Sequence, residues 1–221
     1  MEEIVRIGRG HLALHGAAGL SLRAVARELG VVSSAVYRYV KNRDELLTLL
    51  VVDGYNALGD AVDTALETVD SGDFDGQFRA LGRAVRSWAL AEPACYGLLF
   101  GSPVPGYRAP AEQTTGPGTR VIGQLVRIFQ GAHQAGVLLP ENGRVDAAKT
   151  ALSGDFAAIR AEFSLTLDDA ALTRGVLVWA ALFGAVNFEV FGQYGAETFS
   201  NPAALFDAQL DTLAQMAGLA A

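Results

Sequence analysis

The sequence SLRAVARELGVVSSAVYRYVKNR, residues 21–43, decides the fold of the N-terminal part of the chain. A hydroxyl residue, Ser21, stands at the N-cap position of a first helix predicted over residues 21–29, whose apolar residues recur at the spacing of one buried face. Gly30 can adopt the positive φ that ends such a helix. The first helix is therefore predicted to be short and to turn sharply at this glycine.

A second helix is predicted over residues 33–40. Its apolar residues Val36 and Val40 lie one turn apart and point inward, which leaves the polar and aromatic residues between them on the outer face. Two short helices joined by a tight glycine turn form a helix-turn-helix, whose second helix can enter the major groove of DNA.

This stretch resembles the DNA-binding domain of the TetR (tetracycline-repressor) family of bacterial transcriptional regulators. The resemblance covers residues 4–50 and rests on a series of elements in order: Gly19-Leu20-Ser21, Val25-Ala26, Leu29-Gly30-Val31, the run from Ala35 to Val40, then Lys41, Asn42, Arg43, Glu45 and Leu46. It implies an N-terminal three-helix helix-turn-helix DNA-binding domain over residues 1–48. It also implies a helical effector-binding and dimerisation domain over residues 49–221.

The resemblance assigns DNA contacts to residues of this motif. Short side chains at the start of the second helix would lie closest to the bases, the two tyrosines would be divided between phosphates and bases, and Lys41 and Arg43 would contact phosphates. Arg38 could contact a guanine or face the DNA backbone. Val32 departs from the polar residue common in the family, so part of the specificity could come from DNA shape. The predicted DNA-binding residues are Arg23, Ser33, Ser34, Ala35, Tyr37, Arg38, Tyr39, Lys41 and Arg43.

Composition sets the class of protein. The chain has 221 residues, 51% of them apolar, and only seven prolines, which indicates a folded chain. Residues 1–46 carry seven basic and five acidic side chains, whereas the remainder carries a balance of −9. The overall charge of −7 argues against a protein that coats nucleic acid non-specifically. It is compatible with a small, positively charged N-terminal domain joined to a larger acidic domain.

The sequence also predicts where the protein works. No apolar run approaches the ~18–20 residues of a membrane span, and the acidic start, residues 1–3, is unlike a signal peptide. The single cysteine, Cys95, cannot form an intrachain disulfide; it could serve as a redox sensor, but an inert half-buried thiol is the simpler interpretation. We therefore expect a cytoplasmic location and no membrane partner.

Two patterns near the N-terminus imitate other sites. Gly8-x-Gly10-x-x-Ala13 has the spacing of a dinucleotide-binding loop, but it lacks the preceding strand and the βαβ unit. His11 and His15 have the i, i+4 spacing of metal ligands on a helix, but no third ligand is evident. We therefore predict a plain helix, no metal site and no cofactor. No nucleophile elbow or Walker loop is present, so no catalytic residue is predicted.

Beyond residue 43 the apolar residues recur at helical spacing, without period-2 strands. Loops are predicted at 69–76 and 101–107, where Gly, Asp and Pro cluster. Helices are predicted over residues 44–66, 77–90, part of 91–109, 119–136, 145–163, 168–194 and 203–217. The predicted fold class is therefore all-α.

The body resembles the ligand-binding class of the family that is marked by a Trp-x-x-x-His-Gly element. Trp179 and Gly184 match this element, but Phe183 stands where the histidine would be. The resemblance implies a cavity for a small apolar or aromatic effector, with at most one or two polar anchors. The predicted ligand-binding residues are Trp88, Tyr96, Phe100, Tyr107, Phe129, Phe156, Phe163, Trp179 and Phe183, with His133, Glu162 and Asn187 as the polar candidates.

These observations favour a homodimeric repressor that a small effector releases from a palindromic operator in double-stranded DNA. The last two helices, 168–194 and 203–217, carry more apolar surface than one body needs and are assigned to the two-fold interface. Two alternatives stay open at this stage. One is a helical small-molecule-binding or sequestering protein that has lost DNA binding, and the other is an all-α enzyme acting on a small molecule.

Overall fold

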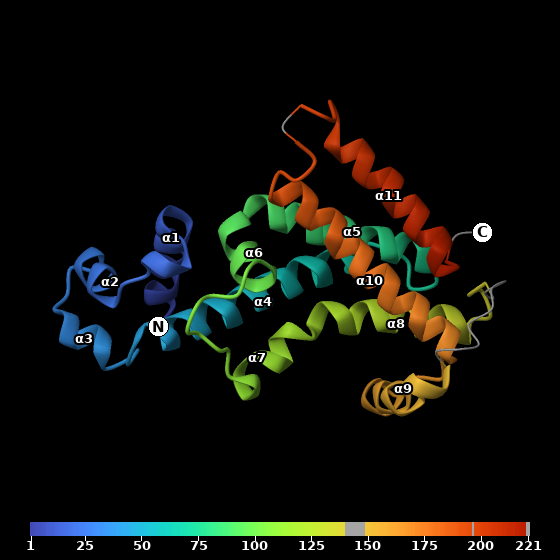
Figure 1. Cartoon of the computed structure of the whole chain (residues 1–221), viewed down its shortest axis with the longest axis horizontal. Coiled ribbons are helices and arrows are strands. Elements are labelled where there is room, and N and C mark those ends of the chain that lie inside the picture. Colours follow the sequence, from blue (N-terminus) through green and yellow to red (C-terminus); the bar gives the residue numbers. More distant parts are fainter. Residues whose placement is uncertain (140–148, 196, 220–221) are drawn as a thin grey trace. The chain divides into compact units, whose positions relative to one another are not determined.

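The computed structural model describes residues 1–139, 149–195 and 197–219, and the regular structure of these residues is helical throughout (Figure 1). This confirms the all-α prediction. The helices, in chain order, are α1 Glu2–His15, η1 Ala17–Gly19, α2 Leu22–Glu28, α3 Ser33–Tyr37, α4 Arg43–Glu67, α5 Phe74–Ala91, α6 Pro93–Phe100, α7 Ala111–Gly118, α8 Arg120–Gln134, α9 Lys149–Phe163, α10 Asp169–Val190 and α11 Pro202–Ala217.

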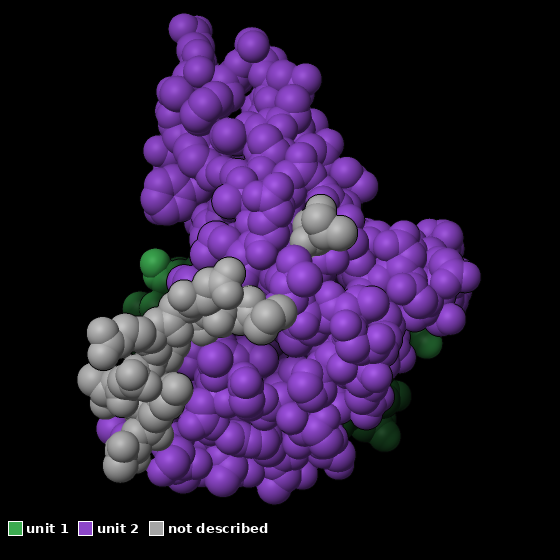
Figure 2. Space-filling model, turned by 90° about the vertical axis from the view of Figure 1, so that its right-hand side faces the viewer, with its two compact units in different colours: residues 1–61, 87–120 green, residues 62–86, 121–221 purple. Residues whose placement is uncertain are grey.

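The chain forms two compact units, coloured separately in Figure 2. Unit 1 comprises residues 1–61 and 87–120, and unit 2 comprises residues 62–86 and 121–221. Each unit therefore takes in two separate stretches of the chain. The boundary predicted after residue 48 separates a DNA-binding domain from an effector-binding domain. The division into two compact units does not test it, so it stays a prediction.

The core of unit 1 is built around the helix-turn-helix. Buried residues of α1, α2, α3 and the start of α4 meet there, and Cys95 from α6 joins them. Gly8 lets α1 approach α4 closely, because a Cβ at this position would lie 3.2 Å from a methyl group of Leu50. The pattern that imitates a dinucleotide-binding loop is therefore part of a helix–helix contact. The buried members of this core are Ile4, Ile7, Leu12, Leu20, Leu22, Val25, Ala26, Val36, Val40, Leu46, Leu47, Leu50 and Cys95.

The turn of the motif forms as predicted, with two local differences. Gly30 has φ +69° and leads from α2 into α3. Ser21 occupies the N-cap position of α2 as predicted, but its hydroxyl makes no capping hydrogen bond. The α-helical part of α3 ends at Tyr37, and a turn carries the chain on to Val40. The buried positions, Val36 and Val40, are those predicted.

Ion pairs join the helices of unit 2. Arg86 of α5 makes two hydrogen bonds, of 2.7 and 2.5 Å, to the carboxylate of Glu189 on α10, and both side chains are largely buried. The Arg86 guanidinium also lies 5.5 Å from the centre of the Phe206 ring on α11. Arg83 pairs with Asp207, also on α11, at 2.8 Å. These contacts hold α5 against the two last helices.

Three sequence-based predictions need comment. Helix α7 was not predicted, because its sequence AEQTTGPG contains two glycines and a proline. The predicted start of the helix over 145–163 lies outside the described residues. The helix α10 is long and apolar enough to span a membrane by length and composition alone, but one such helix is weak evidence and does not change the expectation of no membrane partner. A core or interface helix passes the same test.

Candidate DNA-binding surface and ligand cavity

The second helix of the motif exposes the side chains that the sequence predicts for DNA. Tyr37 and Tyr39 are 43% and 62% exposed, whereas Val36, the residue of α3 that precedes Tyr37, is buried. Arg23, Arg38 and Lys41 are exposed as well and make no ion pair with the described part of the chain. Three cations and two tyrosines thus stand on one small module without internal partners, as phosphate and base-edge contacts require.

Of the nine predicted DNA-binding residues, three are partly covered. Ser33 and Ala35 are half-buried at the start of α3, and Ser34 between them is exposed. Arg43 is also half-buried, and its Nη2 donates a 2.9 Å hydrogen bond to the carbonyl oxygen of Ala17. This guanidinium therefore ties the first residue of α4 to the turn after α1. A contact of Arg43 with phosphate would have to coexist with this bond.

A cap that the sequence analysis did not identify fixes the chain where it leaves the second helix. The Asn42 side-chain oxygen accepts a hydrogen bond of 2.9 Å from the Glu45 backbone N–H. The Glu45 carboxylate in turn accepts one of 2.6 Å from the Lys41 backbone N–H. This is a variant of the capping box, in which the Glu45 carboxylate accepts from the N–H of the residue before the N-cap Asn42 instead of from the N–H of Asn42 itself, and the Asn-x-x-Glu spacing could have indicated it. The two hydrogen bonds hold the backbone of Lys41, one of the predicted DNA-binding residues, against the start of α4.

We expect the substitution Asn42→Ala to lower the free energy of unfolding by about 1 kcal/mol, because the first turn of α4 loses its side-chain cap. Thermal or urea unfolding of the variant measures this loss. Asn42→Asp keeps the acceptor and serves as the matched control. Equal destabilisation by both substitutions would contradict a capping role.

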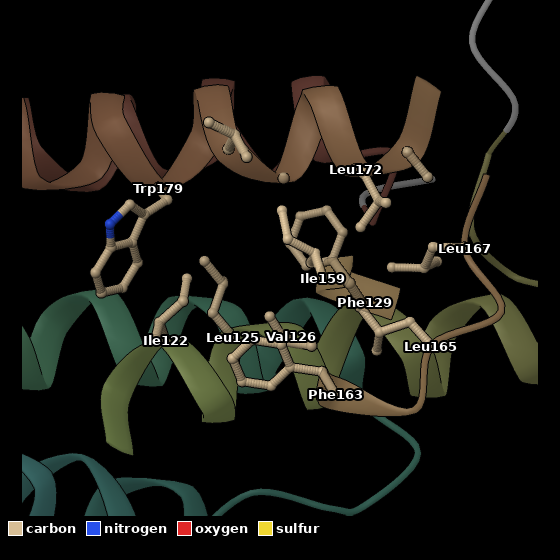
Figure 3. Close-up of a pocket in the computed structure, with 13 residues that line it drawn as sticks. Ile122, Leu125, Val126, Phe129, Ile159, Phe163, Leu165, Leu167, Leu172 and Trp179 are labelled. Carbon is tan, nitrogen blue, oxygen red and sulfur yellow. The ribbon is translucent and has the colours of Figure 1, made fainter. Parts of the chain in front are cut away.

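Unit 2 contains a cavity of about 170 Å³ between α8, α9 and α10. Figure 3 shows side chains of these helices and of the loop between α9 and α10 converging on one space. Apart from the indole nitrogen of Trp179, the lining side chains are hydrocarbon. The cavity is lined by Ile122, Leu125, Val126, Phe129, Ile159, Phe163, Leu165, Leu167, Ala171, Leu172, Gly175, Val176 and Trp179.

Comparison with known proteins identifies both parts of the chain. Residues 4–50 match the family model described as bacterial regulatory proteins, tetR family, and residues 78–213 match the one described as tetracyclin repressor-like, C-terminal domain. The chain belongs to the TetR family. It is a helix-turn-helix transcriptional regulator, and its resemblance to this family is confirmed.

Similar proteins support the same assignment. The chain is 50% identical over 208 residues to the HTH-type transcriptional regulators Rv1816 of Mycobacterium tuberculosis and Mb1846 of Mycobacterium bovis, covering 94% of this chain and 87% of each relative. The crystal structure of the regulatory protein SCO4313 shares 32% identity, with a TM-score of 0.75 over 96% of this chain and 93% of that one. FadR from Bacillus subtilis, in complex with stearoyl-CoA, shares the fold at 14% identity, with a TM-score of 0.63 over 96% of each chain. The two mycobacterial relatives are named as transcriptional regulators, which implies a non-enzymatic role.

The cavity of this TetR-family regulator contains three of the predicted ligand-binding residues, Phe129, Phe163 and Trp179. Phe183 does not line it but packs against Trp179, with ring centroids 4.2 Å apart and the rings tilted by 43°. Phe156 is buried elsewhere on α9. The lining residues that sequence reasoning missed are aliphatic, such as Ile159, and helical spacing gave no signal to separate them from ordinary core.

The four other predicted aromatic residues belong to unit 1. Tyr96 and Phe100 contact each other, with ring centroids 5.0 Å apart, and Trp88 lies against the core of the helix-turn-helix. The Tyr107 hydroxyl lies 3.0 Å from the Thr48 hydroxyl on α4. These residues therefore support the DNA-binding module.

The structure does not bring the three polar candidates to the cavity. His133 and Glu162 are exposed at the ends of α8 and α9. Asn187 is half-buried on α10, where its side-chain oxygen is buried without a hydrogen-bond partner in the described residues. None of the three lines the cavity, which therefore offers a ligand no polar anchor from them.

Burial raises the pKa of the Cys95 thiol, and the neighbouring Arg9 offsets this only in part. Since the thiolate is the reactive form, we expect alkylation by iodoacetamide at pH 8 to be at least roughly tenfold slower in the native protein than in urea. Mass spectrometry of timed samples measures both rates. Equally fast labelling of the native protein would revive the alternative of a redox sensor.

Proposed function

We propose that this TetR-family regulator is a homodimeric repressor that a small apolar or aromatic effector releases from a palindromic operator. The observation that carries the proposal is the hydrocarbon-lined cavity of unit 2 in a chain that also exposes an intact DNA-binding motif. An apolar ligand gains free energy by leaving water for such a space. Binding affects DNA affinity only if the ligand prefers one of two conformations of the protein.

The cavity suggests the size of the effector. An engineered protein cavity of about 150 Å³, lined by Leu, Ile and Phe, stays dry and binds benzene. A cavity of about 170 Å³ therefore suits one aromatic ring or a short branched hydrocarbon group. FadR binds stearoyl-CoA, and a chain of that length would require this cavity to enlarge. We favour the smaller ligand.

Dimerisation would use α10 and α11. The outer surface of these helices exposes several large apolar side chains, among them Leu177 at 52%, Phe188 at 47% and Phe191 at 44%. A groove between the two helices, which includes Gly184 and Ala208, adjoins them. Apolar surface of this extent is typical of a protein interface. We therefore assign the apolar character of α10 to a subunit interface in the cytoplasm.

In the dimer, each second helix would read half of the operator. The two helices must be separated by about 34–36 Å, or by a multiple of this distance, to reach successive major grooves. We assign base contacts to Ser33, Ser34 and Ala35, phosphate contacts to Lys41, and mixed roles to the two tyrosines. Arg23, Arg38 and Arg43 would contribute mainly to the electrostatic attraction of phosphates.

A titration of the purified protein against DNA from upstream of its own gene, at several salt concentrations, tests the proposal. We expect a saturable complex that resists competitor DNA and weakens steeply as salt rises. A screen of small aromatic and branched aliphatic compounds should then find one that dissociates the complex. If the titration showed no specific complex and selection from random DNA enriched no sequence, operator binding would be refuted. Ligand sequestration would then become the better interpretation.

A further inference from the structure

Val32, the residue that immediately precedes α3, is poorly suited to the stability of the free protein. Its side chain is 71% exposed, the highest value among the valines of the described residues. It occupies the N-cap position, where its carbonyl oxygen accepts a 2.9 Å hydrogen bond from the Ala35 N–H but its side chain cannot cap. Valine is among the least favourable N-cap residues, whereas serine and asparagine are among the best. The residue thus combines an exposed apolar group with a missing cap.

The position of Val32 gives its methyl groups a target on DNA. In a helix-turn-helix, the N-terminal residues of the second helix contact base edges. The C5-methyl group of thymine is the apolar group that bases present in the major groove. Ser33 and Ser34 beside Val32 are short, and Ala35 is half-buried. Val31 and Val32 are the exposed aliphatic side chains at this end of α3, and Val32 is the more exposed of the two and the nearer to the helix.

We propose that Val32 contacts the C5-methyl group of a thymine in each operator half-site and is a specificity-determining residue. This assignment rests on the proposed function, because it requires that the module binds an operator. The contact buries the exposed methyl groups of valine and removes the methyl group of thymine from water. Both gains appear only in the complex, so the exposure of Val32 in the free protein is accounted for.

Removal of the methyl group from the DNA tests the contact. Selection from random DNA first defines the operator and the positions at which thymine is preferred. Deoxyuridine then replaces thymine at each of these positions, which deletes one methyl group and leaves the base pair intact. At one position in the half-site, we expect a replacement made in one half-site at a time to weaken binding of the wild-type protein about fourfold, since one buried methyl-sized group is worth about 0.8 kcal/mol.

The substitution Val32→Ser tests the same contact from the side of the protein. Serine removes both methyl groups and can cap α3, so the thermal midpoint should stay equal or rise, which excludes unfolding as the cause of any change. The variant should bind thymine and deoxyuridine operators equally and should lose the thymine preference at that position in a new selection. Val137→Ser, at a valine 53% exposed outside the motif, is the matched control and should discriminate like the wild type.

Three results would overturn the assignment. The wild type could bind the deoxyuridine operators as tightly as thymine operators at every position. The Val32→Ser variant could retain the full fourfold difference. In both cases operator binding itself would stand. If selection enriched no sequence at all, this assignment would fall together with the proposed operator binding.

Discussion

Replacing Gly175 by leucine is expected to abolish the response to effector while DNA binding persists. Gly175 lines the cavity from α10, and a Cβ built on it has no atom within 4 Å. The Cβ of a leucine would therefore meet no neighbouring atom, and we expect the rest of the side chain to occupy the cavity. The cavity of about 170 Å³ would lose most of its volume, and a ligand of one ring would no longer fit.

The expected change in DNA affinity follows from the coupling between effector binding and DNA binding. An effector that changes DNA affinity by about 5- to 150-fold in the wild type corresponds to a coupling free energy of 1–3 kcal/mol. In Gly175→Leu this ratio should fall to about one, while affinity for the operator without effector stays within about twofold. The thermal midpoint should be equal or higher, because glycine in a helix costs about 1 kcal/mol relative to a good helix former.

Benzene is a usable probe before the effector is known. Benzene-saturated buffer should raise the thermal midpoint of the wild type, since a ligand that binds the folded state stabilises it, and the rise should vanish in Gly175→Leu. The matched control is Gly154→Leu, at an exposed glycine of α9 that also has open space around its Cβ. It gains the same helix propensity without entering the cavity. An undiminished effector response in Gly175→Leu would place the effector site elsewhere.

The helix-turn-helix could be predicted from the sequence because its determinants are local. The turn requires a positive φ at one position, and a glycine stands there; the inward residues Val36 and Val40 lie one turn apart and are both buried. What the local pattern could not show is that Cys95, some 50 residues further on, completes the same core. Helical spacing identifies the buried face of an element but not the neighbour that covers it.

The same limit explains the errors in the predicted ligand site. Trp88, Tyr96 and Trp179 all have aromatic side chains at helical spacing, yet only Trp179 lines the cavity. The polar candidate His133 sits beside an apolar stripe in the sequence but is exposed at the last turn of α8. Periodicity in the sequence cannot distinguish residues beside the apolar face that another helix buries from residues beside it that stay exposed to solvent. The cavity depends on how three helices meet, and that information is non-local.

Tyr37→Ala is expected to reduce operator affinity by roughly 30-fold to 10⁴-fold, because each lost DNA contact costs about 1–3 kcal/mol and a dimer loses two. Tyr37 is 43% exposed and does not belong to the core of unit 1. Its removal should therefore change the free energy of unfolding by no more than about 0.5 kcal/mol. The combination of lost DNA binding and retained stability distinguishes an interface residue from a core residue.

Lys41→Ala separates phosphate contacts from base contacts on the same surface. We expect it to weaken binding to all sequences alike and to reduce the slope of log K against log salt by about one for each subunit. Tyr37→Phe, which keeps the ring, reports how much of the tyrosine effect belongs to its hydroxyl group.

Arg127→Ala, at an exposed cation of α8 in unit 2, is the matched control and should leave the slope unchanged. If Tyr37→Ala and Lys41→Ala both bound the operator like the wild type, the exposed face of α3 would not be the DNA-binding surface. Because Val36 and Val40 are buried, the opposite face of the second helix could not replace it without unfolding the module. The whole assignment of DNA contacts therefore depends on these two side chains.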